Sequence, residues 1–579
     1  MRVTLVALNA MYPHTNLAVR MLHAAVRRAD VPVTHSVVEL HINQPLEAQL
    51  RAVWETALDV AAFSVYIWNV EAVLRLSRAL CGALPGLRVV LGGPEVSFDA
   101  QARLDAHPHL SAIVCGEGEE SYPALLGAWA RGEVPRVPGV CARGAEAAWL
   151  PAQSVPPERW IDPYADGLGM AGEGEPAPDV RRIWYAETSR GCPFQCQFCL
   201  SSREAGVRAL PAEQAIARLT ALAARGVPLV KLVDRTFNYD PARARAIWAA
   251  LMALDTRCVF HFEVEAHLLG EADLALLAQA PPGRFQFEIG VQSTTPAALR
   301  AVRRGDHFPA IAHAVHRLRE AGNIALHLDL IAGLPGEDGA GFARSFDDVY
   351  ALRPHMLQLG FLKLLPGSGL RRDAEALGLV YAPDPPYPVL RTAQMSHADI
   401  QHLWDVETVH DWYGNSGRFV ASVRLLTWAR SPFAAFSALA QDVRARGALE
   451  GGRSQAQRVE LLWAHACALW GGQDATDEQR VRLCAMAQAL RFDALCAGFM
   501  PGQLPEALQD ALDEAERARD ADTLRALVPE AAARRGCVLA RFTWDVLALR
   551  EAGTLTETPC RLLIDRRRGT VTRVEDDPA

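Results

Sequence analysis

Three cysteines, Cys192, Cys196 and Cys199, follow the apolar segment at residues 183–185 and a predicted turn at 189–191. Three thiolates on one tight loop can bind three irons of a four-iron, four-sulfur cluster, which leaves the fourth iron open to another molecule. A structural zinc site is the alternative. It needs four ligands, usually with a second Cys or His pair at short spacing, and no such pair follows here. The spacing therefore favours a cluster with one open iron.

Composition limits the class of protein. The chain has 579 residues, half of them apolar, which is enough for about three or four domains with separate cores. Its 59 basic and 67 acidic side chains form no dense basic stripe, so no nucleic-acid partner is supported. Because no apolar stretch reaches the length of a membrane span and the start lacks a signal-peptide cleavage region, we expect a cytoplasmic protein without membrane contact.

Residues 1–132 alternate between strand and helix patterns. Short apolar runs are predicted as strands at 3–8, 34–40, 60–65, 89–91 and 112–115, with amphipathic segments between them. The pattern predicts a Rossmann-like open α/β sheet, in which ligands bind beyond the carboxyl ends of the strands. The dinucleotide fingerprint of spaced glycines does not follow the first strand, which argues against a dinucleotide.

A second alternating region, predicted at residues 181–385, follows a Pro- and Gly-rich stretch at 133–180. We interpret that stretch as a linker with one small ordered piece. Beyond it, strands are predicted at 183–186, 229–233, 259–264, 285–291, 326–332 and 356–364. Six strands with helices between them predict a partial, open (β/α) barrel, whose chemistry collects at the carboxyl ends of the strands.

Residues 386–579 are predicted to form a mainly helical carboxyl-terminal domain. Helices are expected at 403–408, 420–439, 457–469, 479–490 and 508–518, and a hairpin at 560–564 with 570–574. The aromatic residues Trp404, Trp412, Tyr413 and Trp428 are expected in its core rather than in a site. The nine cysteines outside the three-cysteine run are scattered singly, and most are expected to be buried apolar residues.

The cysteine spacing, with Phe198 directly before the last cysteine, resembles the signature of the radical S-adenosylmethionine (SAM) superfamily. That resemblance implies that the open iron binds the amino and carboxylate groups of SAM. It places the backbone of Phe198 beside the adenine, the segment from Asp234 to Phe237 near the methionyl amino group, and the run from Asp329 to Gly336 along the adenine. It further implies SAM contacts from Glu263, Glu265, Glu288, Gln292, Ser293, Gly333 and Leu334. For any one of these carboxylates, a solvated strand end is the simpler interpretation.

Two glycine-containing loops carry a further resemblance. Residues 92–95 (Gly-Gly-Pro-Glu) follow the fourth strand and residues 115–119 (Cys-Gly-Glu-Gly-Glu) the fifth, as in the cobalamin-binding domain of cobalamin-dependent radical SAM proteins. The resemblance implies that these loops cradle the nucleotide tail and the corrin edge, while residues 64–69 approach the lower corrin face. The cobalamin contacts expected in this way are Asn9, His14, Ser64, Tyr66, Trp68, Asn69, Gly92, Gly93, Pro94, Glu95, Gly116, Glu117, Gly118 and Glu119.

The motif Asp-x-His-x-x-Gly of other cobalamin proteins is not completed here. The nearest match, Asp105-Ala-His107, continues without the glycine. We therefore do not expect a histidine ligand to cobalt from this position, and Trp68, Tyr66 and His14 are the candidates at the lower face. Two alternatives stay open: the aromatic residues only cap the sheet, or the sheet holds no cofactor.

The two resemblances together imply an enzyme that reductively cleaves SAM to a 5′-deoxyadenosyl radical, with methylation of an unactivated carbon as the leading reaction. Rearrangement or ring formation without methyl transfer is an alternative. A methylthiotransferase would need a second cluster, for which Cys81, Cys115 and Cys141 are available, and a non-catalytic cobalamin sensor is a further alternative. The implied partners are a small-molecule or peptide substrate and an electron donor such as flavodoxin or ferredoxin. Residues 491–493 and 501–505 resemble the tail of an uncharacterised subgroup of these proteins.

Overall fold

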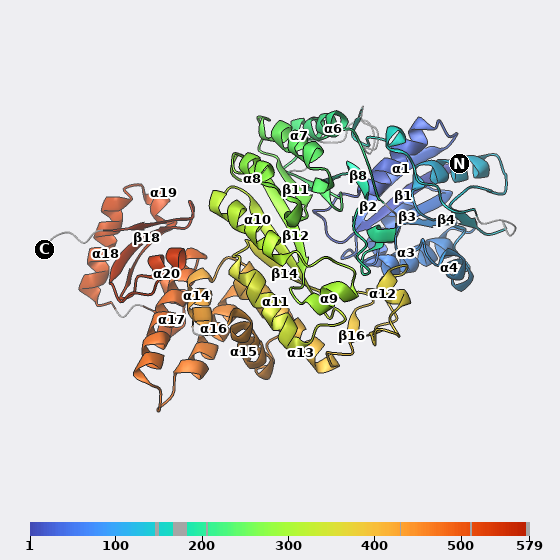
Figure 1. The fold of residues 1–579 in the computed structure, drawn as a ribbon. Helices are drawn as coiled ribbons and strands as arrows, with labels where there is room; N and C mark the ends of the chain where they lie inside the picture. The colour runs from blue at the N-terminus through green and yellow to red at the C-terminus, as the bar shows by residue number, and fades with distance from the viewer. Residues whose placement is uncertain (145–149, 166–181, 204–205, 429, 510–511, 575–579) are drawn as a thin grey trace. The chain divides into compact units, whose positions relative to one another are not determined.

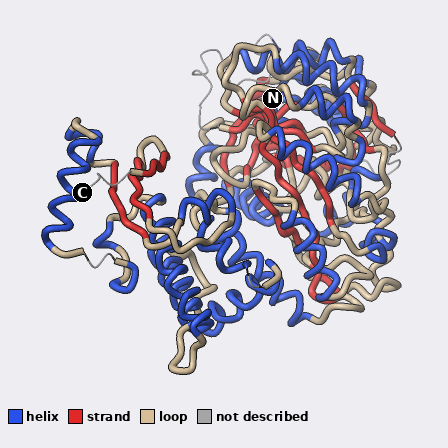
Figure 2. The backbone as a smooth tube through the Cα atoms, turned by 60° about the vertical axis from the view of Figure 1, so that its left-hand side comes forward, coloured by secondary structure: helices blue, strands red, loops and turns tan. Residues whose placement is uncertain are grey.

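The computed structural model describes residues 1–144, 150–165, 182–203, 206–428, 430–509 and 512–574. The chain divides into two compact units. The first comprises residues 1–338 and 352–396, and the second comprises residues 339–351 and 397–579. Figure 1 shows the course of the chain, and Figure 2 separates its helices from its strands.

The first unit begins with a six-stranded sheet, called here the first sheet, in the order β2-β1-β3-β4-β5-β6. The five predicted parallel strands are confirmed, and a sixth, β6, pairs antiparallel with β5. Since β6 lies in the predicted linker, the sheet extends further than expected, to Ala142. The strands are β1 (Arg2–Asn9), β2 (Thr34–His41), β3 (Val60–Ser64), β4 (Arg88–Gly92), β5 (Ala112–Val114) and β6 (Val140–Ala142).

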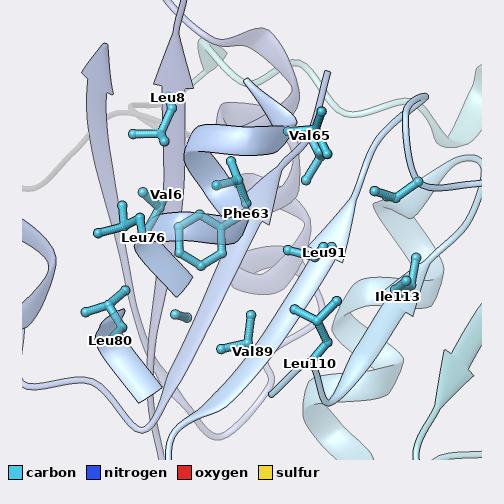
Figure 3. Packing of buried hydrophobic residues seen from close by; sticks show 14 of the residues in the cluster. Val6, Leu8, Phe63, Val65, Leu76, Leu80, Val89, Leu91, Leu110 and Ile113 are labelled. Atoms are coloured by element: carbon cyan, nitrogen blue, oxygen red, sulfur yellow. The ribbon is translucent and has the colours of Figure 1, made fainter. Parts of the chain in front are cut away.

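Helices cover both faces of the first sheet, because alternate residues of each buried strand point to opposite sides. On one face, Leu8, Phe63 and Leu91 pack with Leu76 and Leu80 of α3, as Figure 3 shows. On the other face, strand residues pack against α1 and α5. The helices are α1 (Leu17–Arg28), α2 (Leu46–Trp54), α3 (Val70–Ala83), α4 (Ala100–Ala106) and α5 (Gly118–Ala130).

The second sheet of the first unit, called here the barrel sheet, has the predicted six strands, all parallel, in the order β14-β13-β12-β11-β10-β7. It is an open sheet, with β7 and β14 at its edges. The strands are β7 (Ile183–Ala186), β10 (Leu229–Leu232), β11 (Val259–Glu263), β12 (Phe285–Gln292), β13 (Ala325–Ala332) and β14 (Met356–Phe361). The helices between them are α6 (Ala212–Ala224), α7 (Pro241–Met252), α8 (Glu271–Leu277), α9 (Pro296–Ala301) and α10 (Phe308–Ala321).

The loop after β1 covers the β7 edge of the barrel sheet. Ile183 donates its backbone N–H to Pro13 (2.7 Å) and accepts from Thr15 (3.2 Å). Covering an edge strand removes its tendency to pair with other chains. The contact also fixes the carboxyl-terminal loops of the first sheet against the barrel sheet.

A small hairpin frames the cysteine run. The turn predicted at 189–191 is wrong, because β8 (Ser189–Cys192) is a strand that pairs antiparallel with β9 (Gly206–Ala209). Gly191 has a φ of +87°, and a Cβ there would lie 2.3 Å from the Gly206 carbonyl oxygen. Only glycine fits this close approach of two backbones. The hairpin therefore holds the first cysteine at the end of a strand.

The second unit is mainly helical and ends in a three-stranded antiparallel sheet, β17-β18-β19. The predicted hairpin is confirmed as β18 and β19, and β17 adds a strand. Its helices include α11 (Gly339–Ala351), α13 (His397–His410), α14 (Val420–Trp428), α15 (Pro432–Ala445), α16 (Gln455–Trp470), α17 (Asp477–Cys496), α18 (Glu514–Leu527), α19 (Ala531–Arg534) and α20 (Val546–Ala552), and its strands are β17 (Cys537–Phe542), β18 (Cys560–Asp565) and β19 (Thr570–Arg573).

Two helices of the second unit differ from expectation. The single helix predicted at 420–439 is split into α14 and α15, because Ser431 caps α15 and Pro432 occupies its first turn. The helix predicted at 508–518 is wrong: α18 begins at Glu514, after a capping box formed by Asp513 and Glu516.

The expected core role of the aromatic residues of the second unit is only partly correct. Tyr413 is buried, but Trp404 and Trp428 are exposed, Trp428 to 57%. No helix among the described residues is long and apolar enough to cross a bilayer.

Candidate functional site

A cavity of about 170 Å³ lies at the carboxyl ends of the barrel strands, beside the cysteine run. Its wall contains the three cysteines and five of the residues predicted to contact SAM, namely Phe198, Glu263, Glu265, Glu288 and Gln292. Its lining also includes Arg235 and Thr236, from the segment 234–237 expected near the methionyl amino group, and Asp329, the first residue of the run expected along the adenine. Arg304 lines the cavity too, and the sequence interpretation gave it no role.

The other predicted SAM residues lie outside the lining of this cavity. Asp234 is buried and accepts hydrogen bonds from the Thr188 backbone N–H (2.7 Å) and the Ser189 hydroxyl (2.8 Å), so it fixes the start of β8. Phe237 packs against Trp248 and Phe262 in the barrel core. Ser293, Gly333 and Leu334 are also absent from the lining, and Ser293 donates to Glu337 (2.7 Å).

The loop at residues 192–199, called here the cysteine loop, is held from two sides. The Gln197 backbone N–H donates to Val302 (2.9 Å), and its carbonyl accepts from Leu370 (3.0 Å). The Thr236 hydroxyl lies 3.3 Å from the Cys192 sulfur. Among the described residues, no three His, Cys, Asp or Glu side chains form a group that could hold a metal ion. The three thiols line a shared cavity instead, and a cluster takes each thiolate on a different iron.

A bulge in β12 aims one polar side chain at the cavity. The register with β13 shifts between Gly290 and Gln292, and Gln292 has a φ of +70°. A Cβ at position 290 would lie 2.2 Å from the Gln292 amide nitrogen, so a larger residue there would displace the Gln292 side chain. The Gln292 side-chain oxygen is buried without a hydrogen-bond partner. Such an orphaned acceptor fits the donor groups of SAM, its ammonium and ribose hydroxyls.

Carboxylates form the floor of the cavity, and their environments differ. A hydrogen bond from His261 (2.9 Å), aided by Lys231 (3.1 Å), lowers the pKa of Glu288 to about 2. Burial, with the charges of Glu288 and Glu263, raises the pKa of Asp329 to about 8. One Asp329 oxygen is buried without a partner. The floor therefore offers an ionised acceptor beside a carboxyl group that stays protonated at neutral pH.

The carboxylates predicted at the cobalamin loops are already paired within the protein. Glu95 accepts from Arg103 (2.9 Å) and from the Tyr387 hydroxyl. Glu117 pairs with Arg190 (2.9 Å) and Arg208, and Glu119 pairs with Arg190. Arg190 and Arg208 belong to the β8–β9 hairpin. Glu117 and Glu119 therefore tie the first sheet to the hairpin that carries Cys192.

The glycines of these loops serve close backbone packing. Gly93 has a φ of +127°, and a Cβ there would lie 2.3 Å from the Val65 carbonyl oxygen. Gly116 has a φ of +72°, and a Cβ there would lie 2.8 Å from the Cβ of Ala152. Both positions require glycine for the protein's own fold, whatever ligand the loops approach.

Polar residues at the same edge fix the loops. Asn69 donates to the backbone of Leu8 (2.9 Å) and Ser64 (3.1 Å), and Asn9 donates to His14 (2.9 Å). His14 lies 2.7 Å from the Tyr185 hydroxyl of β7. Burial, together with the charges of Lys231 and Arg182, lowers the pKa of His14. His14 is thus engaged with the barrel sheet.

Large apolar side chains remain exposed at the carboxyl ends of β1, β3 and β4. We call Met11, Tyr12, Trp68 and Phe98 the apolar edge; all four are at least 40% exposed. The Trp68 ring stacks on Tyr66 with centroids 4.4 Å apart and planes 6° from parallel. Such a row beyond adjacent parallel strands fits a large planar ligand, as a corrin is.

The cysteines available for a second cluster serve the core. Cys115 and Cys141 are buried in the apolar core of the first sheet, and Cys81 packs against it. Burial raises the pKa of all three thiols. Inert, protonated thiols of this kind are typical of structural cysteines.

Three family models match the chain. Residues 3–126 match a B12 binding domain, residues 186–349 the Radical SAM superfamily, and residues 375–535 a protein family of unknown function (DUF4080). The first two models confirm the cofactors expected from the sequence, which are cobalamin, SAM and the four-iron, four-sulfur cluster.

Curated relatives share parts of the chain. A 2-(S-pantetheinyl)-carbapenam-3-carboxylate methyltransferase from Streptantibioticus cattleyicolor is 28% identical over 49% of this chain and 44% of its own length. The cobalamin-dependent radical SAM methyltransferase TokK from Streptomyces tokunonensis is 35% identical over 24% and 22%, respectively. A hopanoid C-3 methylase from Methylococcus capsulatus is 31% identical over 32% and 35%. The matched stretches span less than half of each relative.

Solved structures share the fold. The cobalamin-dependent SAM radical enzyme OxsB, solved with aqua-cobalamin, has a TM-score of 0.60 at 16% identity, covering 90% of this chain and 82% of that chain. The radical SAM methyltransferase TsrM from Kitasatospora setae, solved with cobalamin and an iron-sulfur cluster, has a TM-score of 0.55 at 20% identity, covering 69% and 84%. The predicted fold class is confirmed by these matches.

Proposed function

We propose that this chain, which belongs to the cobalamin-binding radical SAM enzymes by its paired B12 binding and radical SAM domains, methylates an unactivated carbon of its substrate. One observation carries the proposal. The cavity that the three cysteines line and the exposed apolar edge of the B12 domain belong to the same compact unit. Ion pairs join the B12 domain to the hairpin that carries Cys192. The methyltransferase names of the relatives support this reaction type.

The cofactors would supply one-electron cleavage of SAM and a transferable methyl group. The chain's own residues hold and orient them. Cys192, Cys196 and Cys199 would each bind one iron. Gln292 and Glu288 would accept hydrogen bonds from the ammonium and hydroxyl groups of SAM. The protonated carboxyl group of Asp329 would donate a hydrogen bond to an acceptor atom of SAM. Holding these groups rigidly raises the rate by fixing one reactive geometry.

The apolar edge would support the corrin. Trp68, stacked on Tyr66, would lie against one face of the ring and exclude water from it. The loops at residues 92–95 and 115–119 would follow the cofactor's periphery with their backbone. A small molecule or peptide is proposed as substrate, and a reduced flavodoxin or ferredoxin as the electron donor.

The test is anaerobic turnover of protein produced with cobalamin uptake. With SAM and a chemical reductant, we expect corrinoid absorption bands, a loaded cluster, and formation of 5′-deoxyadenosine and S-adenosylhomocysteine. A fully loaded cluster without corrinoid bands would contradict cobalamin dependence. Bound cofactors with neither product formed, under every substrate tried, would instead support a sensor.

A further inference from the structure

Arg304 lies against one of the cluster cysteines. Its guanidinium Nη1 is 3.6 Å from the sulfur of Cys196, within hydrogen-bond reach for a sulfur acceptor. Cys196 is the most buried of the three cysteines, with 6% of its surface exposed. Arg304 follows α9 and also lines the cavity. No motif in the sequence marks this position.

The guanidinium is held from its other side. Its Nη2 donates to both oxygens of Glu265, at 2.9 and 3.0 Å, and to the Gly290 carbonyl. Burial opposes ionisation of Glu265, but the neighbouring His267 and the hydrogen-bonded Arg304 outweigh it and lower the pKa of Glu265. Glu265, expected from the sequence to contact SAM, is thus occupied as the partner of Arg304. An arginine fixed by a carboxylate in this way keeps one orientation.

We propose that Arg304 is a positioning residue that sets the reduction potential of the cluster through its hydrogen bond to Cys196. Hydrogen bonds to cluster sulfurs and nearby positive charge favour the reduced, more negative state, and therefore raise the potential. The short, buried contact makes the effect larger than that of a solvent-exposed charge. The inference rests on the cluster and does not depend on methyl transfer.

The experiment is a redox titration of the loaded cluster, followed by electron paramagnetic resonance, in wild type, Arg304→Gln, Arg304→Lys and Arg303→Gln. Arg303 is the exposed neighbour and provides the same loss of charge without a sulfur contact. For Arg304→Gln we expect a tenfold or larger fall in the equilibrium constant for reduction, which is about 59 mV toward negative potential. Arg304→Lys should shift less in the same direction, and Arg303→Gln should stay at the wild-type value.

Equal potentials in wild type and Arg304→Gln would overturn the proposal, as would an equal shift in Arg303→Gln. If Arg304→Gln fails to load a cluster, Arg304→Lys decides: a lower potential supports the proposal and an unchanged one overturns it. The potential is read without substrate or cobalamin. Failure of methyl transfer therefore leaves this measurement intact, and a wild-type potential in the variants leaves the proposed reaction intact.

Discussion

Five strands of the first sheet and all six strands of the barrel sheet are parallel, and both sheets place polar residues at the carboxyl ends of these strands, yet those residues lie in different surroundings. In the barrel sheet, Glu263, Glu288 and Asp329 face a cavity. In the first sheet, Glu95, Glu117 and Glu119 are paired with arginines, and the surface left open is apolar. The same topology therefore yields a polar cavity in one sheet and an exposed apolar edge on the other. Which one results depends on the partners that other segments bring.

The largest effect is expected from a change in the cysteine loop, which should affect the barrel sheet's cavity and leave the first sheet unaffected. Cys196→Ala should abolish cluster loading and SAM cleavage, because a cluster with two protein ligands is not held. Cobalamin binding by the first sheet should persist. Iron content and the corrinoid absorption bands measure the two outcomes on one sample. SAM cleavage by the variant would show that the cluster is assigned to the wrong residues.

The ion pairs that join the two regions come next. Arg190→Leu should lower the free energy of unfolding by about 3–5 kcal/mol, because it leaves three largely buried carboxylates, Glu117, Glu119 and Glu187, without their shared cation. Denaturant unfolding of wild type and variant measures the difference. Arg131→Leu is the control, since its pair with Glu133 is exposed and water screens it. Equal losses in both variants would show that the buried pairs have no special role.

The apolar edge is tested by Trp68→Ala. Losing the contact area of one tryptophan should weaken cobalamin binding roughly 10- to 100-fold, from about 1.5–3 kcal/mol for a buried large apolar side chain. Cluster content should not change. Trp428→Ala in the second unit is a matched control, because Trp428 is also exposed, to 57% against 48% for Trp68. Unaltered cobalamin affinity in Trp68→Ala, measured by equilibrium dialysis, would place the corrin elsewhere.

The last effect concerns the cavity floor and depends on pH. The pKa of Asp329 is raised to about 8 by burial and neighbouring carboxylates, against 3.8 ordinarily. Between these values the folded protein binds a proton that the unfolded chain has released, so stability falls as pH rises through that window. Asp329→Asn removes this cost. In ligand-free protein its melting temperature should exceed that of wild type, by more at pH 8 than at pH 5.

Between pH 3.8 and 8, the free energy of unfolding that Asp329→Asn gains over wild type should grow by at most about 1.4 kcal/mol for each pH unit. Asp255→Asn, at an exposed position, should show the same difference from wild type at both pH values. A gain for Asp329→Asn that does not grow with pH would mean that Asp329 is ionised in the folded protein, and the floor would then be anionic throughout.

Much of the fold could be predicted from local sequence. The apolar runs identified every parallel strand of both sheets, because the strands are either buried throughout, as β3 is, or apolar at every second residue, as β12 and β13 are. The antiparallel strand β6 was missed since it lies in a Pro- and Gly-rich stretch, and β8 since Ser-Arg-Gly is typical of a turn. Both segments are strands because they pair with β5 and β9, respectively. The local sequence of a segment does not reveal which strand it will pair with.

The sequence alone placed the three cysteines proposed as cluster ligands on one loop, because three thiols within eight residues must share a loop wherever that loop lies. It also determined the order of strands and loops that resembles a cobalamin-binding domain. Only the tertiary structure decided which polar residues stay free. Glu117 meets Arg190, and Arg304 meets both Cys196 and Glu265, across long stretches of chain. Such pairs depend on the packing of whole elements, so they set the chemistry of each edge without leaving a local signature.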